Sequence, residues 1–287
     1  MIAVLKHELR GYFHSLTAYV CGAFLLMFIG LGAMLYNIQA AVSNFEFVLN
    51  FTSIIFAVIV PILTMKVLAE ERKQKTDQLL YSLPLTTAQV ILGKFLALLV
   101  IYLIPICIIG IYPLIFAKFG AVYLPTSYGS LFAFFLLGAA LISLGIFISS
   151  LTESQGLAAG VGIALILFNY YSVQLAEYVS STTLGTALAL IALICLLGLI
   201  INHLTRSNKF TAIITVGLCG IVIFTYFADA EVFDGLLPNI MKQLSLFDRL
   251  NIFVNGVFDL TAIIYFVTFI AFFLFLSVQS MEKRRYN

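Results

Sequence analysis

The residues with the greatest capacity for chemistry lie between positions 66 and 94. Six of the eight residues in 70–77 are ionic. An ionic side chain costs about 2.5–3.5 kcal/mol near the centre of a bilayer, so this segment is expected in water. Leu79, Leu80 and Leu83 follow it with the spacing of one helical stripe. An apolar stripe behind a charged rim is typical of a helix that docks on another protein.

Within the same segment, one helix is predicted to end and another to begin. Pro84 ends the short helix, because proline cannot continue the helical hydrogen-bond ladder. Thr86 and Gln89, three residues apart, form a capping box directly before a long apolar run. We predict a short amphipathic helix held outside the membrane between two spanning helices. The simpler alternative, a solvated loop with no docking role, explains neither the leucine stripe nor the capped restart.

Motifs of catalysis are missing from the sequence. Gly93-Lys94 resembles the end of a phosphate-binding loop, but position 88 is Ala where such a loop needs Gly, and Phe95 replaces the Ser or Thr that would hold magnesium. The chain has no HExxH, GxSxG or CxxC motif. Its three histidines and four scattered cysteines lack metal-ligand spacing. We therefore expect no enzyme activity, no metal and no bound cofactor.

Composition determines the fold class. Of 287 residues, 62% are hydrophobic and only 10% are charged, and the mean hydropathy is +1.11. Soluble domains carry about 25% charged residues, so this is an all-α polytopic membrane protein that contacts the lipid bilayer. The net charge of +2, without a basic run interleaved with aromatics, excludes a nucleic-acid partner.

The predicted architecture is a single transmembrane domain over 1–287. A helix over 1–16 has one apolar face and lies in the membrane interface. Eight stretches are long enough to span a bilayer. They lie near 17–36, 51–68, 90–116, 129–150, 156–175, 185–202, 210–228 and 259–280. Residues 229–258 form an acidic extracytoplasmic segment with one or two short helices.

The distribution of Lys and Arg predicts the orientation. One side of the predicted topology holds twelve of these residues and the other holds three, Lys118, Lys242 and Arg249. Because positive residues concentrate in cytoplasmic loops, both termini and segment 66–94 are predicted to be cytoplasmic. An odd number of spans would destroy this asymmetry.

The predicted spans offer little polar chemistry, since no ionisable residue lies clearly in the middle of one. Ion-driven carriers commonly use such residues. A polar group near the outer end of the fifth span could line a substrate path, although an interfacial polar belt explains it more simply. Its members are Asn169, Tyr170, Ser172 and Gln174. Gly156 and Gly160 form a GxxxG motif that permits close helix packing within the subunit or at a dimer interface.

Several pieces of the sequence, taken together and in order, resemble the type-2 ABC exporter permeases, most closely the gliding-motility permeases and their bacterial relatives. They are the runs 6–9, 70–73, 76–80, 90–95 and 145–152, together with Pro84 and the stretch 247–265. The resemblance covers roughly 1–175 and 245–285. Residues 185–228 depart from it, because members of the family commonly have six spans.

The resemblance implies a transport mechanism. Two permeases, identical or different, form the membrane core, and two separate ATPase subunits bind ATP and magnesium at the cytoplasmic membrane of a bacterium. A coupling helix, here about 71–83, would sit on the ATPase. The implied coupling residues are Glu70, Glu71, Arg72, Lys73, Thr76, Leu79, Leu80, Leu83 and Glu153.

Two other functions remain open at this point. A secondary carrier or channel would transport alone along an ion gradient, and the sequence offers no clearly buried charge for it. A membrane enzyme or assembly factor would need catalytic side chains clustered at one membrane face. Apolar, uncharged spans favour a lipid-like or hydrophobic peptide cargo, although the sequence does not identify it.

Overall fold

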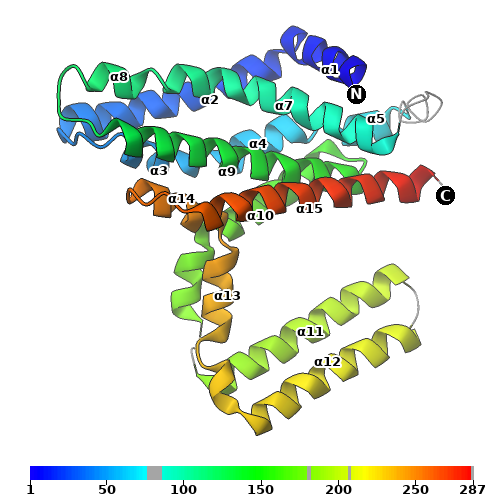
Figure 1. The fold of residues 1–287 in the computed structure, drawn as a ribbon. Coiled ribbons are helices and arrows are strands. Elements are labelled where there is room, and N and C mark those ends of the chain that lie inside the picture. The colour runs from blue at the N-terminus through cyan, green and yellow to red at the C-terminus, as the bar shows by residue number, and fades with distance from the viewer. Residues whose placement is uncertain (76–85, 180–181, 206–207, 286–287) are drawn as a thin grey trace. The chain divides into compact units, whose positions relative to one another are not determined.

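The computed structural model describes residues 1–75, 86–179, 182–205 and 208–285, and these form helices and connecting turns without a strand (Figure 1). The described chain divides into two compact units. Unit 1 comprises residues 1–170 and 246–287, and unit 2 comprises residues 171–245. The all-helical fold class is thereby confirmed, whereas the single domain over 1–287 stays a prediction.

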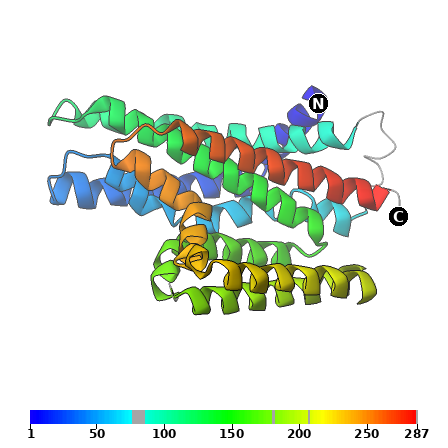
Figure 2. The same cartoon turned by 60° about the horizontal axis from the view of Figure 1, so that its bottom comes forward.

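Unit 1 is a bundle of long apolar helices with shorter helices at both ends. Its elements are α1 (Ile2–His14), α2 (Leu16–Gly32) continued by the π-helix η1 (Ala33–Gln39), α3 (Glu46–Ser53), α4 (Phe56–Thr64), α5 (Ala69–Lys73), α7 (Thr87–Ile109), α8 (Tyr112–Phe116), α9 (Leu124–Leu151), most of α10 (Gln155–Tyr178), α14 (Leu246–Val254) and α15 (Leu260–Arg285). Figures 1 and 2 place the N- and C-termini at the same end of this bundle. We call it the terminal end, and we call the end that carries the starts of α3 and α9 the opposite end.

The helix α9 is the centre of unit 1, in contact with α4, α7, α14 and α15. It is apolar all round, as expected of a helix buried on every side. Small residues let its neighbours approach closely. A Cβ on Gly145 would overlap the hydroxyl of Thr64 on α4, and one on Gly138 would overlap the ring of Tyr102 on α7. These contacts fix α4 and α7 against α9.

The structure bears on two local predictions, the start of α7 and the span over 51–68. Thr86 is the N-cap of α7, and its hydroxyl accepts a hydrogen bond from the backbone N–H of Gln89 at 3.3 Å, so the predicted start of this helix is confirmed. The predicted span over 51–68 instead falls within a broken helix. This broken helix begins at Glu46 and bends by 59° between Ser53 and Phe56.

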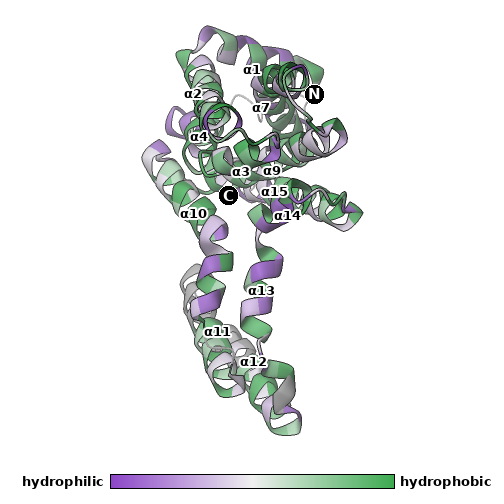
Figure 3. Cartoon of the chain, turned by 90° about the vertical axis from the view of Figure 1, so that its left-hand side faces the viewer, coloured by the Kyte–Doolittle hydropathy of each residue, from purple (hydrophilic) through white to green (hydrophobic). Residues whose placement is uncertain are grey.

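Unit 2 contains a helical hairpin and two shorter helices. They are α11 (Thr183–Thr205), α12 (Asn208–Ala228), the 3₁₀-helix η2 (Ala230–Phe233) and α13 (Leu236–Leu244). The helices α11 and α12 pack against each other, as Figures 1 and 2 both show. Hydrophilic residues interrupt α13, whereas hydrophobic ones dominate α2 (Figure 3). The short helices predicted within 229–258 are present.

Five described helices are long and apolar enough to cross a membrane, and a sixth candidate is the broken pair of α3 and α4. The protein is thus a multi-pass membrane protein. The predicted count of eight is not confirmed, because the described parts of α11 and α12 qualify only as shorter apolar helices. All six candidates begin in unit 1, and their even number agrees with termini that share one end.

Candidate functional site

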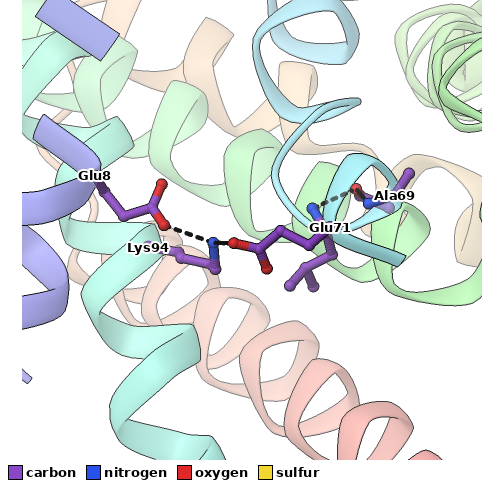
Figure 4. Close-up of polar contacts among 6 residues, drawn as sticks. Glu8, Ala69, Glu71 and Lys94 are labelled. Carbon is purple, nitrogen blue, oxygen red and sulfur yellow. Dashed lines mark hydrogen bonds and ion pairs between the residues drawn. The ribbon is translucent and has the colours of Figure 1, made fainter. Parts of the chain in front are cut away.

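Lys94 is the centre of a buried ionic cluster at the terminal end. Its side chain is only 2% exposed, although it lies about two turns into α7. Its Nζ donates hydrogen bonds to Oε1 of Glu8 on α1 and to Oε1 of Glu71 on α5, each at 2.6 Å (Figure 4). A buried ammonium group is tolerated when it is paired and hydrogen-bonded. The two carboxylates meet that requirement, and the cluster joins three helices.

Close packing of α1 on α7 brings Glu8 to this position. Val4 and Glu8 are four residues apart and share one face of α1. A Cβ on Gly93 would lie 3.0 Å from Cβ of Val4, so glycine lets α1 approach α7 closely. Packing and pairing therefore account for Gly93-Lys94, the two residues that resemble a phosphate-binding loop.

Ser149 fixes the beginning of α5 on α9. Its buried hydroxyl oxygen accepts hydrogen bonds from the backbone N–H groups of Leu68, at 3.1 Å, and Ala69, at 3.0 Å. The first N–H groups of a helix have no partner within the helix, and Leu68, the N-cap residue, supplies none from its own side chain. A serine from another helix thus caps α5, one turn beyond the close contact at Gly145.

The C-terminal part of α15 is attached to three other parts of the terminal end. The hydroxyl of Thr87 donates to Oε1 of Glu282 at 2.7 Å. Arg284 forms an ion pair with Glu153, in the turn between α9 and α10. The hydroxyl of Ser280 donates to the carbonyl oxygen of Ser150 at 3.0 Å. Charged and hydroxyl groups therefore connect α15 to α7, to α9 and to the turn before α10.

A polar hollow of about 400 Å³ opens beside the cluster, between α1, α4, α5 and α7. Its carboxylates and amines are Glu8, Glu70, Glu71, Lys66 and Lys94. Tyr12 also lines it, and burial, followed by the negative charge of Glu8, raises the pKa of its phenol above the usual range. Tyr12 therefore stays protonated at physiological pH and can act there only as a neutral hydrogen-bonding group.

The predicted coupling residues fall into three groups. Glu71 and Arg72 point inward, Glu71 onto Lys94 and Arg72 with 7% exposure. Glu70 is half-buried at the hollow, and Lys73 is exposed beside a second pocket that Glu153 also lines. The remaining predicted residues, Thr76, Leu79, Leu80 and Leu83, lie outside the described residues.

The residues predicted for a substrate path do not share one role. Oδ1 of Asn169 accepts a hydrogen bond from the backbone N–H of Leu246 at 3.0 Å, at the start of α14. The ring of Tyr170 packs edge-on against Phe247, with centroids 5.0 Å apart. Both contacts hold α14 to α10 within unit 1. In unit 2, Ser172 is buried and Gln174 is exposed. The path through these residues stays a prediction.

Sequence reasoning missed Lys94, Glu8 and Ser149 as parts of this site. A signal for Lys94 was present, because a lone lysine inside an apolar run must find a partner. The partner itself was not deducible, since Glu8 is 86 residues away in sequence. Ser149 carried no signal, because a serine in a spanning helix most often bonds its own preceding turn.

Comparison with protein families finds one that matches this chain. The family is described as ABC-2 family transporter protein, and its model matches residues 2–253. No curated protein matches the chain. The match includes Lys94, Glu8 and Glu71, and it ends before α15 begins.

Proposed function

Since the chain belongs to the ABC-2 family of transporter proteins, we propose that it is the membrane permease of an ABC exporter, driven by a separate ATPase that docks on segment 66–94. Membership implies an ABC ATPase as the general partner and a transport role for the chain itself. The proposal adds export, docking on this segment and a cytoplasmic terminal end in a bacterial cytoplasmic membrane. The resemblance of residues 70–95 to the gliding-motility permeases supports that branch.

The observation that carries the proposal is the buried cluster of Lys94, Glu8 and Glu71. It lies where segment 66–94 enters and leaves the bundle, on α5 and α7. A force applied to α5 would reach α7 and α1 through two short ion pairs, and α9 through the hydroxyl of Ser149. A plain solvated loop needs no such anchoring of its first helix.

Coupling requires the ATPase to interact differently with two conformations of the permease. In this proposal the docked segment moves when the ATPase dimer closes, and α1, α5 and α7 move with it as one body. ATP and magnesium bind to the partner, and this chain supplies only the mechanical connection. The polar rim of the docking surface is then Glu70, Lys73 and Glu153, because Glu71 and Arg72 face inward.

A second permease is the other partner we propose, as an identical or a different chain. No atom of unit 1 lies within 4 Å of a Cβ built on Gly160, and only the adjacent Ser154 approaches Gly156. The GxxxG motif of α10 is therefore not used for packing inside unit 1. This open stretch of small residues supports a dimer interface along α10.

The experiment that tests docking changes the leucine stripe. The full chain is expressed with a candidate ABC ATPase partner, and the complex is purified through the permease. Leu79→Asp with Leu80→Asp should abolish co-purification of the ATPase. Ile240→Asp with Leu244→Asp, on exposed positions of α13, is the matched control and should leave the complex intact. A complex that survives the Leu79 and Leu80 changes would refute docking on this segment.

A second candidate function, an ion-driven carrier, is favoured by one observation, a buried carboxylate at Glu46. The two candidates separate in reconstituted vesicles. An exporter stops when the ATPase partner carries an inactive nucleotide site, whereas a carrier continues on an ion gradient alone. Cysteine labelling from each side of the membrane, at Lys73 and at residue 287, tests whether the terminal end is cytoplasmic.

A further inference from the structure

Glu46 is a buried carboxylate at the opposite end of unit 1. It is the first residue of α3 and only 3% exposed. Its Oε1 accepts a hydrogen bond from the hydroxyl of Ser127 on α9, at 2.8 Å, and Ser127 is itself fully buried. Its second oxygen, Oε2, is also buried and has no hydrogen-bond partner. One oxygen of the carboxylate therefore has a hydrogen bond, and the other has none.

The helices packed against α3 offer little to neutralise this group. They are α2, η1, α9 and α14. The first three contain no Asp, Glu, Lys, Arg or His, and α14 contributes Asp248 and Arg249. The other titratable side chains on these elements are Tyr19, Cys21, Tyr36 and Tyr128, and Tyr123 directly precedes α9. Arg249 lies over the ring of Tyr265, at 5.2 Å from its centroid, and no ion pair among the described residues involves Glu46.

An isolated carboxylate away from water is unstable unless a positive charge accompanies it. The N-terminus of α3 offers partial compensation, since backbone N–H groups there favour negative charge. It does not supply a partner for Oε2. In membrane proteins, buried ionisable residues of this kind mark ion or proton sites.

The helix that carries Glu46 is broken. α3 and α4 form one broken span with a 59° bend, and discontinuous helices commonly hold the ion sites of transporters. Thr52, next to the break, is also fully buried with a hydroxyl that lacks a partner. Glu46 therefore lies on the shorter arm of a bent helix whose polar groups are incompletely satisfied.

We propose that Glu46 and Ser127 form a cation site in which Oε2 of Glu46 receives a proton or a small monovalent cation, while the hydroxyl of Ser127 holds Oε1. Occupancy stabilises the bent arrangement of α3 against α9. Loss of the cation leaves the carboxylate charged and favours an arrangement in which α3 meets water. The site makes the permease sensitive to pH or to an alkali-metal ion at the end opposite the ion-paired cluster.

Two measurements on the purified full chain in lipid nanodiscs test the site. Infrared spectroscopy records the C=O stretch of a protonated carboxylic acid at neutral pH. Thermal unfolding is recorded in sodium, potassium and choline salts at equal ionic strength, because a bound cation raises the unfolding temperature by mass action. Glu46→Gln keeps the size of the side chain and an oxygen for Ser127, and it removes the charge.

Each outcome decides the proposal. An infrared band that disappears in Glu46→Gln identifies a bound proton. A sodium- or potassium-dependent unfolding temperature that becomes independent of the salt in Glu46→Gln identifies a metal cation. An ionised carboxylate without either effect overturns the proposal. Because the ATPase is absent from both measurements, such a failure leaves the proposed exporter function untouched.

Two further variants test whether the signals come from the site itself. Ser127→Ala removes the hydrogen bond to Oε1 and should shift the infrared band or weaken the salt dependence. This variant therefore tests the site even if Glu46→Gln does not fold. Thr52→Val removes a buried hydroxyl that also lacks a partner. It should leave both signals unchanged. Equal effects of Thr52→Val and Ser127→Ala would assign the signals to general loosening of α3 and overturn the site.

Discussion

The two ends of unit 1 each bury one charged side chain, and they treat it differently. At the terminal end Lys94 is 2% exposed and paired with two carboxylates. At the opposite end Glu46 is 3% exposed, and one of its oxygens has no partner. Burial is the same, whereas Lys94 has two ion-pair partners and Glu46 has none among the described residues.

This difference in pairing suits the two charged groups to different roles, one that connects helices and one that responds to a bound cation. A fully paired buried charge is costly to disturb, because removing one partner leaves the other charge unpaired away from water. It therefore holds helices together through a motion. A partly compensated charge gains much from one added cation, so its surroundings change with occupancy. We infer that the terminal end transmits force and that the opposite end senses an ion.

The largest effect is expected from Lys94→Met. The change leaves Glu8 and Glu71 facing each other without a cation, and breaking a buried pair in this way costs about 3–5 kcal/mol. We expect a large fall in the unfolding temperature and loss of the ATPase complex, measured by thermal unfolding and co-purification. Lys66→Met, on a half-buried lysine of the same hollow, is the charge-matched control and should have a small effect.

Restoring charge balance sharpens this prediction. Glu8→Gln and Glu71→Gln added to Lys94→Met remove the two orphaned carboxylates, and most of the lost stability should return. If the triple variant is as unstable as Lys94→Met alone, the lysine acts through its packing and the contrast between the two ends loses its basis.

A smaller effect is expected at Gly145, which brings α4 against α9 near the terminal end. Alanine there would overlap the hydroxyl of Thr64, and such overpacking costs about 1–3 kcal/mol. Gly22→Ala, on α2, is the matched control, since no atom lies within 4 Å of a Cβ built there. Thermal unfolding should show a loss for the first and no loss for the second. Thr64→Ala should rescue Gly145→Ala, and failure of that rescue would exclude this contact as the cause.

The sequence predicted the parts of this structure that depend on local patterns. The apolar runs, the helix within 1–16 and the cap at Thr86 follow from hydropathy, periodicity and hydrogen bonding within a few residues. Pro61 predicts a bend in this span, but the structure places the break earlier, between Ser53 and Phe56, where no proline or glycine marks it.

The contacts of the site are long-range, and the sequence contains no local trace of them. The charge run predicts Glu71 on an exposed rim, because a glutamate in a dense charge run is usually solvated. It instead turns inward to Lys94, which no pattern within segment 66–94 reveals. Glu46 was passed over because it precedes the predicted span, and the helix that buries it begins five residues before the apolar run does.

The smallest effect is expected from Glu46→Gln, and it tests the comparison most directly. Glutamine keeps the oxygen that Ser127 binds and replaces a charged, half-satisfied group with a neutral one. The amide nitrogen then lacks a partner at the position of Oε2, so gain and loss nearly offset, and stability should change by about 1 kcal/mol or less. Glu71→Gln, measured beside it, removes the same charge from a paired site and should cost clearly more. If both glutamates cost equally, the carboxylate of Glu46 is as well compensated as that of Glu71, and the opposite end is a second connector.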